Sequence, residues 1–152
     1  MRPWFAAWIG GLCGTAAMTI VLKTETRFRK NARGPIDYDA SDHVAIAACN
    51  VLRRPVPQSA AARNRISSTV HWGYGSAVAV TFEALRRATG SDARATVLFD
   101  AGCQAMAFTL FPTLGETPPP WAWDRAALSS SLAVHAIYAV TVAQVARRIR
   151  SR

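Results

Sequence analysis

Two ionisable side chains lie close to the middle of long apolar segments, where burial of an ionisable group is energetically costly. Asp100 lies near the centre of residues 93–111, and His135 lies near the centre of residues 126–146. Gln104 follows Asp100 by one helical turn, so a helix places both on one face. A carboxylate and an imidazole at similar depth favour a hydrogen bond that joins two helices. The alternative is a site for a proton or a cation, because histidine titrates near neutral pH.

A second pattern, H-x-x-Y, occurs twice, as His71 with Tyr74 and as His135 with Tyr138. Each pair shares one helical face, because residues three apart are neighbours on a helix. Two histidines on neighbouring helices could ligate a haem or a metal ion, but nothing else in the sequence signals a cofactor, so we predict no cofactor and no metal. The sequence contains no nucleophile with a base, no phosphate loop and no paired catalytic carboxylates. We therefore predict that the protein is not an enzyme.

These side chains belong to four stretches that are long and apolar enough to cross a bilayer: residues 4–22, 66–85, 93–111 and 126–146. Each has roughly the 20 residues that a helix needs to span the hydrocarbon core. The first stretch has no polar face, which argues against the alternative of a soluble helical bundle. Its apolar run also continues past the point where a signal peptide would be cleaved, so we expect a retained helix. The sequence predicts an all-α fold, a bundle of four transmembrane helices in a single domain over residues 1–152.

Two further features concern how the helices pack. Ala6, Gly10 and Gly14 recur at four-residue spacing, which is a ridge of small residues that lets another helix approach closely. Residues 42–54 are too short to span and carry one apolar stripe, formed by Val44, Ala47, Ala48, Val51 and Leu52. We predict a short amphipathic helix there, which lies at the membrane interface or against the bundle. Glu83, near the end of the second stretch, is expected to pair with Arg86 or Arg87.

The charge pattern agrees with a membrane location. The net charge is +9, and nearly all of the 18 Lys and Arg residues lie between the apolar stretches or after the last one, where they can contact anionic lipid head groups. They form no single stripe with interleaved aromatic residues, so we predict no nucleic-acid partner. Four spans divide them ten to eight between the two sides, which leaves the orientation open. Cys13, Cys49 and Cys103 lack metal-binding spacing and are expected to be packing residues.

The two halves of the chain share short patterns. Residues 11–19 and 101–109 have Cys, Ala and Thr at equivalent positions, and an H-x-x-Y segment follows each. Two repeated helical hairpins therefore remain an open alternative to unrelated halves.

The same motifs resemble the YagU-like family of small bacterial inner-membrane proteins of uncharacterised function. The resemblance is carried by three groups of residues: His71, Trp72, Tyr74 and Gly75; Pro119, Pro120, Trp121 and Trp123; and His135 with Tyr138. It implies a location in the bacterial inner membrane and a helix count, but no reaction.

Together these features predict a multi-pass inner-membrane protein with a structural or partner-binding role. A second copy or another membrane protein would contact the small-residue face of the first helix and the basic segment after it. The alternative is a small transporter or channel-like protein that moves protons or cations along a polar seam of Asp100, Gln104, His135, Tyr138, His71 and Tyr74. A transport path requires these side chains to line a connected cavity, whereas a structural role requires them to be packed and hydrogen-bonded.

Overall fold

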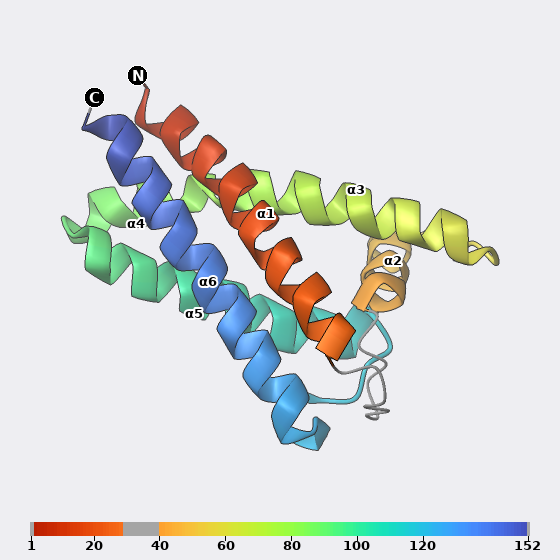
Figure 1. The fold of residues 1–152 in the computed structure, drawn as a ribbon. Helices are drawn as coiled ribbons and strands as arrows, with labels where there is room; N and C mark the ends of the chain where they lie inside the picture. Colours follow the sequence, from red (N-terminus) through yellow and green to blue (C-terminus); the bar gives the residue numbers. More distant parts are fainter. Residues whose placement is uncertain (1, 29–39, 152) are drawn as a thin grey trace.

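The computed structural model describes residues 2–28 and 40–151, and every regular element in these ranges is a helix (Figure 1). In chain order the elements are α1 (Pro3–Phe28), α2 (Ala40–Val51), α3 (Ala60–Val78), α4 (Val80–Thr89), α5 (Asp92–Leu114), the short 3-10 helix η1 (Pro120–Ala122) and α6 (Arg125–Arg150). The predicted all-α class is confirmed.

Three helices begin at side chains that cap their first turn. The first amide groups of a helix lack partners within it, and an oxygen just before the helix supplies one. The side chain of Ser59 accepts from the amide of Ala62 at the start of α3, and Asp124 accepts from Ala127 at the start of α6 at 2.6 Å. Ser91 caps α5 in the same way. Gly90 ends α4 with a φ of 65°, a left-handed conformation that glycine adopts without strain.

The helices form two antiparallel pairs that cross each other obliquely (Figure 1). α1 and α6 make the most extensive contact in the fold and run in opposite directions, so the two chain ends lie together. The path through α3 and α4 runs opposite to α5. α3 and α5 make few direct contacts with each other, whereas α2 packs against both. A space between α3 and α5 is therefore bounded by the other helices.

Glycines of α1 allow the close approach of its neighbours. A methyl group added at Gly10 would lie 2.8 Å from the carbonyl oxygen of Val142, and one added at Gly14 would lie 2.7 Å from the ring of Tyr138. The ridge of Ala6, Gly10 and Gly14 thus lies against α6 of the same chain, with Ala6 fully buried. The helix that approaches this face closely at Gly10 and Gly14 is therefore α6 of the same chain.

The second apolar stretch, expected as one helix over residues 66–85, is divided at Ala79 between α3 and α4. The hydroxyl group of Thr81 donates to the carbonyl oxygen of Val78, and the amide of Phe82 bonds to the carbonyl of Ala79, three residues back rather than four. Such side-chain competition for a helical carbonyl bends or interrupts a helix. Among the described residues, three helices are long and apolar enough to cross a membrane: α1 from Pro3 to Glu25, α5 and α6. α3 is not among them.

α2 ends at Val51 rather than near residue 54, because Arg53 adopts a left-handed conformation with a φ of 51°. Its contacts place it against the bundle. His43 Nδ1 lies 2.7 Å from the carbonyl oxygen of Gly115, and Asn50 donates to the carbonyl of Leu114 at 2.7 Å. Both bonds satisfy carbonyl groups at the end of α5 that have no partner within that helix.

An ion pair joins α2 to the start of α3. Arg63 Nε lies 2.8 Å from Asp42 Oδ1, and the same guanidinium also donates to the carbonyl oxygens of Pro57 and Gln58. The hydrogen bond from Arg63 holds the pKa of Asp42 below its ordinary value. α2 is therefore tied both to α3 and to α5.

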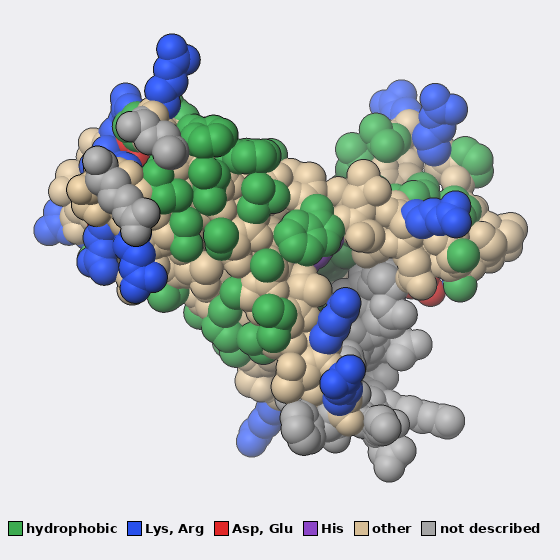
Figure 2. Space-filling view, turned by 45° about the horizontal axis from the view of Figure 1, so that its top comes forward, with side chains coloured by type: hydrophobic (Ala, Val, Ile, Leu, Met, Phe, Trp, Pro, Cys, Tyr) green, Lys and Arg blue, Asp and Glu red, His purple; other side chains and the backbone are tan. Residues whose placement is uncertain are grey.

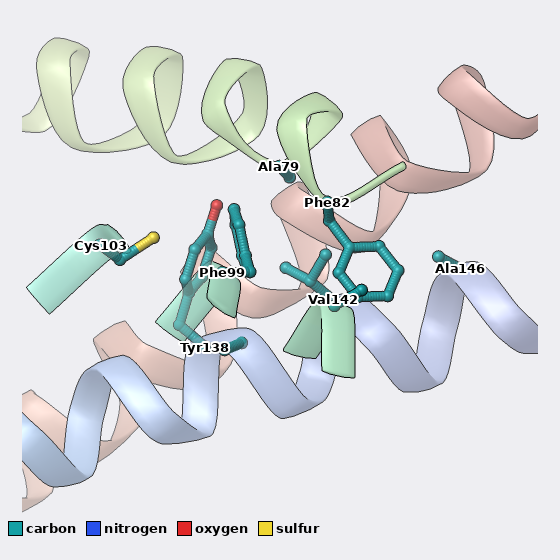
Figure 3. Close-up of a cluster of buried hydrophobic side chains, with 9 residues drawn as sticks. Ala79, Phe82, Phe99, Cys103, Tyr138, Val142 and Ala146 are labelled. Carbon is teal, nitrogen blue, oxygen red and sulfur yellow. The ribbon is translucent and has the colours of Figure 1, made fainter. Parts of the chain in front are cut away.

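The buried core lies where α4, α5 and α6 meet (Figure 3). The ring of Phe99 packs edge-on against that of Phe82, with 6.0 Å between ring centres, and lies 5.6 Å from the ring of Tyr138. Val142 and small residues of the same helices complete the cluster. Aromatic pairs in such offset arrangements contribute about 0.5–1.5 kcal/mol beyond the area that they bury.

The three apolar helices bury little of their surface within the chain. Between 22% and 33% of the residues in their most apolar windows are buried. Trp4, Phe5 and Trp8 of α1 are exposed, as are Val97 and Leu98 of α5. Figure 2 shows hydrophobic side chains across the middle of one face, with Lys and Arg side chains gathered toward the ends of the molecule. Exposed apolar side chains along long helices are typical of lipid-facing surfaces.

Candidate functional site

A cavity of about 530 Å³ lies between α1, α2, α3, α5 and α6. Its volume falls within the range of about 300–1,000 Å³ that small-molecule sites occupy. None of the described residues that line it is Asp, Glu, Lys or Arg. The lining is formed mainly by aliphatic side chains, with a few hydroxyl, imidazole and phenol groups among them. The cavity is therefore suited to an uncharged, largely apolar occupant.

Both H-x-x-Y pairs line this cavity. His71 and Tyr74 enter it from α3, and His135 and Tyr138 enter it from α6. The spacing of three residues places each pair on one helical face, and both faces are directed toward the cavity. Four of the six side chains of the expected polar seam are thus brought together.

His71 is hydrogen-bonded to α1. Its Nε2 atom lies 2.9 Å from Thr19 Oγ1, and the hydroxyl group of Thr19 donates its one proton to the carbonyl oxygen of Thr15 at 2.7 Å. With this assignment of the hydroxyl proton, Thr19 Oγ1 accepts from His71, and the ring proton is assigned to Nε2. Nδ1 of a neutral imidazole is left as a hydrogen-bond acceptor. It has no hydrogen-bond partner among the residues that the structure describes.

His135 is hydrogen-bonded within its own helix. Its Nδ1 atom lies 2.8 Å from the carbonyl oxygen of Ser131, and a carbonyl can only accept. Nδ1 therefore carries the proton and Nε2 is the acceptor. No side chain in the described ranges bonds to Nε2. The two histidines thus present the same chemistry, a ring nitrogen with a free lone pair.

The two tyrosines are fixed by different contacts. The hydroxyl group of Tyr138 donates to the carbonyl oxygen of Gly75, which joins α6 to α3. The hydroxyl group of Tyr74 donates to the sulfur of Met106 at 3.4 Å, a weak bond to α5. Tyr138 therefore contributes to the packing of the bundle, whereas Tyr74 is held loosely and is still 45% exposed.

Asp100 and Gln104 do not line the cavity, and the hydrogen bond that we expected between Asp100 and His135 is not formed among the described residues. Asp100 Oδ1 is buried without a partner there, although Asp100 lies within electrostatic range of His135. Gln104 donates to the hydroxyl group of Ser131 at 3.0 Å, and its Oε1 atom is also buried without a partner in the described ranges. These two residues form a separate polar group between α5 and α6.

α2 closes one side of the cavity. All five residues of its apolar stripe, Val44, Ala47, Ala48, Val51 and Leu52, line the cavity wall. The packing is incomplete, since Val51 and Leu52 remain 63% and 69% exposed. The helix that the sequence places at the interface or against the bundle thus covers a space that it does not fill.

Sequence reasoning missed two polar residues of α1. Thr15 lines the cavity, is 1% exposed, and its hydroxyl oxygen has no hydrogen-bond partner among the described residues. Thr19 orients His71. Their spacing of four residues puts them on one face of α1, and this spacing was the signal that could have found them.

Glu83 forms the ion pair expected from its spacing, and it does more. Its fully buried carboxylate accepts from Arg86 at 2.8 Å and from Arg87 at 2.9 Å, and Arg150 at the end of α6 lies 3.5 Å away. Arg150 also pairs with Asp92 at 2.8 Å. The cluster joins α4, α5 and α6 at the end of the bundle where both termini lie.

The described residues contain no group of three or more His, Cys, Asp and Glu side chains that could hold a metal ion. The fold and the cavity define a class: a helical protein with three described helices long and apolar enough to cross a membrane, and with a cavity of ligand size whose described lining has no charged residue. No family model, curated protein or solved structure matches the chain. The function is therefore argued from the geometry of the chain itself.

Proposed function

We propose that this chain is a multi-pass, non-enzymatic protein of the bacterial inner membrane that binds a partner within the bilayer. The observation that carries the proposal is the apolar surface that α1, α5 and α6 leave uncovered. In water such a surface promotes aggregation, whereas lipid tails cover it. The resemblance to the YagU-like family, carried by the H-x-x-Y and proline–tryptophan motifs, agrees with this location.

Four passes fit the path of the chain better than three. Arg87 of α4 lies over the ring of Trp4 at the start of α1, 4.8 Å from its centre. Arg150 at the end of α6 pairs with Asp92 at the start of α5. Both termini thus share one end of the bundle with the turn between α4 and α5, and an even number of crossings satisfies that arrangement.

In this topology α3 and α4 together make the second pass. Two polar side chains of this path, Ser67 and Ser76, are buried inside the chain rather than facing lipid, and Ser76 donates to the carbonyl of Trp72. Glu83 lies among arginines at the end of the path. The low hydropathy of α3 is therefore compatible with a pass that neighbouring helices shield in part.

The arginines at the two ends of the bundle are suited to anionic lipid head groups. Arg86, Arg87 and Arg150 gather at one end, and Arg53, Arg54 and Arg65 are carried by or lie next to α2 and the start of α3. Each cation near an anionic surface contributes about 1 kcal/mol to the association. Arginines at both ends of the bundle would thus fix the position of the protein across the membrane.

A membrane fractionation tests the location. The tagged protein should pellet with the membranes, resist extraction with alkaline carbonate and be released by detergent. Reporter fusions at both termini should report the same side of the membrane. Recovery of the protein in the supernatant without detergent contradicts the membrane assignment, and reporters on opposite sides contradict the four-pass topology alone.

A second candidate, transport of protons or cations, is favoured by one observation. Asp100 Oδ1 and Gln104 Oε1 are two buried oxygen acceptors, one helical turn apart, without donors among the described residues. Proteoliposomes loaded with a pH-sensitive dye test this candidate. An ion path predicts a flux that Asp100→Asn abolishes while the fold is retained, whereas a binding protein gives the flux of empty liposomes.

A further inference from the structure

The cavity offers hydrogen-bond acceptors to an occupant and no charge. The ring N–H of His71 donates to Thr19 Oγ1, and the ring N–H of His135 donates to the carbonyl oxygen of Ser131. The remaining nitrogen of each ring is an acceptor. An occupant that uses these histidines must therefore bring a donor, as an O–H group does.

Thr15 adds an independent observation. Its side chain is in the cavity wall, almost completely buried, and its hydroxyl oxygen has no partner among the described residues. A buried hydroxyl without a hydrogen bond is costly, so the site is incomplete as it stands. A hydroxyl group on the occupant both donates and accepts. It can donate to an imidazole nitrogen and also accept from Thr15, whereas a carbonyl or an ether oxygen can only accept.

The rest of the wall determines the body of the occupant. The aliphatic stripe of α2 faces the apolar side chains of α5, and the described wall has no cation to pair with a phosphate or a carboxylate. A phosphate or an ionised carboxylate placed against this wall would have no counter-ion in a medium of low dielectric constant. An uncharged molecule with an apolar body meets no such penalty.

We infer that this cavity binds an uncharged, lipid-soluble alcohol, namely an isoprenoid alcohol or a quinol, with its hydroxyl group among Thr15, His71 and His135 and its apolar body against α2 and α5. The inference deepens the proposed function and rests on it, because such molecules reach the cavity from the bilayer. It names the chemical class of the partner and the residues that recognise it.

The test uses the full chain in nanodiscs and four probes. Tritiated farnesol and decylubiquinol carry the hydroxyl group, and farnesyl methyl ether and decylubiquinone are their matched controls without an O–H donor. Retention is compared with that of empty nanodiscs, which corrects for partitioning into lipid. We expect saturable retention of a hydroxyl probe at one per chain, and about three- to tenfold weaker binding of its control, which is the value of one hydrogen bond. Preference for farnesol or for decylubiquinol identifies the source of the alcohol.

Three variants locate the site. His71→Leu removes one acceptor and should weaken binding about three- to tenfold. Ala48→Phe fills part of the cavity from α2 and should weaken binding about tenfold or more. Thr69→Val removes a hydroxyl group from the exposed face of α3, away from the cavity, and should leave binding unchanged. The comparison of probes on the unmodified chain keeps the inference testable if a variant does not fold.

The outcomes are distinct. Equal retention of a probe and its O–H-free control, or no retention above empty nanodiscs, overturns the inference while the membrane location stands. A purified protein that carries haem, with an absorption band lost in His71→Leu and in His135→Leu, also overturns it, because the histidines then ligate iron. Failure of the membrane fractionation overturns the proposed function itself, and the two failures are therefore distinguishable.

Discussion

The packing of α1 on α6 gives the sharpest stability prediction. Adding one methyl group at Gly10 places a carbon atom 2.8 Å from the carbonyl oxygen of Val142 and 3.3 Å from its Cα atom. Both are backbone atoms, so no side chain can rotate away. The two helices must separate by about half an ångström along their most extensive contact, because favourable carbon contacts lie at about 3.5–4.0 Å. Overpacking of this kind costs about 1–3 kcal/mol.

A matched glycine isolates that cost. Gly73 of α3 is exposed, and a methyl group added there meets no atom of the described chain within 4 Å. Both Gly10→Ala and Gly73→Ala gain about 0.5–1 kcal/mol, because alanine loses less conformational entropy in a helix than glycine. Their difference in unfolding free energy is therefore the packing cost, about 1–3 kcal/mol with Gly10→Ala the less stable.

The assay is unfolding in mixed micelles, in which the fraction of sodium dodecyl sulfate is raised and helicity is followed by circular dichroism. Gly102→Ala, which also meets no atom within 4 Å, serves as a second control on α5. Gly14→Ala should also be less stable than the controls, because its methyl group would lie 2.7 Å from the ring of Tyr138 and 3.1 Å from the carbonyl oxygen of that residue. If Gly10→Ala proves as stable as Gly73→Ala, α1 and α6 do not approach each other as closely as described, and the reasoning is refuted.

Three further predictions concern the polar contacts. Glu83→Gln should lower the unfolding free energy by about 1–3 kcal/mol, because it removes the buried charge shared by several arginines. Arg87→Ala should cost less than about 1 kcal/mol, because Arg87 is half exposed. Thermal melting in detergent compares the two variants, and equal losses would contradict the central place of Glu83. The ion pair with Arg63 lowers the folded-state pKa of Asp42. The stabilisation that this pair gives is therefore present above the ordinary pKa of about 3.9 and is lost as the pH falls through the lowered value. Hydrogen exchange of the α2 amides should rise in that range, and Asp42→Asn should remove this rise. Asn50→Ala should raise α2 exchange at neutral pH by about fivefold, the value of one hydrogen bond to α5, and unchanged exchange would show that this bond does not hold α2 in place.

Which helices form could be read from the sequence because the signals are local. Apolar runs of about 20 residues located α1, α5 and α6. The division of the second stretch at Ala79 was not visible in the same way. It depends on how the Thr81 hydroxyl competes for the carbonyl oxygen of Val78, and threonine usually makes such a bond without ending a helix.

The candidate site was predicted in part, because the spacing of residues along one helix is also a local signal. The H-x-x-Y spacing fixes His71 with Tyr74 on one face and His135 with Tyr138 on another, and both faces line one cavity. Depth in the membrane also placed Asp100 level with His135. Depth does not determine the direction in which a side chain leaves its helix, since each residue turns by about 100°.

His135 also had a local alternative that spacing along two helices cannot reveal. Its Nδ1 atom bonds to the carbonyl oxygen of Ser131, one turn earlier in α6, so the ring is oriented without Asp100. The short-range bond spares the chain the cost of bringing two helices into one specific register. A polar residue at the centre of an apolar helix therefore predicts a buried polar group more safely than it predicts the partner of that group.

The cavity follows from the way in which small residues are distributed over the bundle. Glycines of α1 draw α6 close at Gly10 and draw α3 close at Gly11, where an added methyl group would lie 2.8 Å from the carbonyl oxygen of Gly75. α3 and α5 have no such mutual contact, and the space between them is left to α2. α2 is held by His43, Asn50 and Asp42 and by the buried side chains of Ala45 and Cys49, whereas its apolar stripe faces the cavity. A helix that is anchored by hydrogen bonds at the rim, with its apolar stripe over an unfilled space, can admit an apolar molecule without breaking the contacts that hold it.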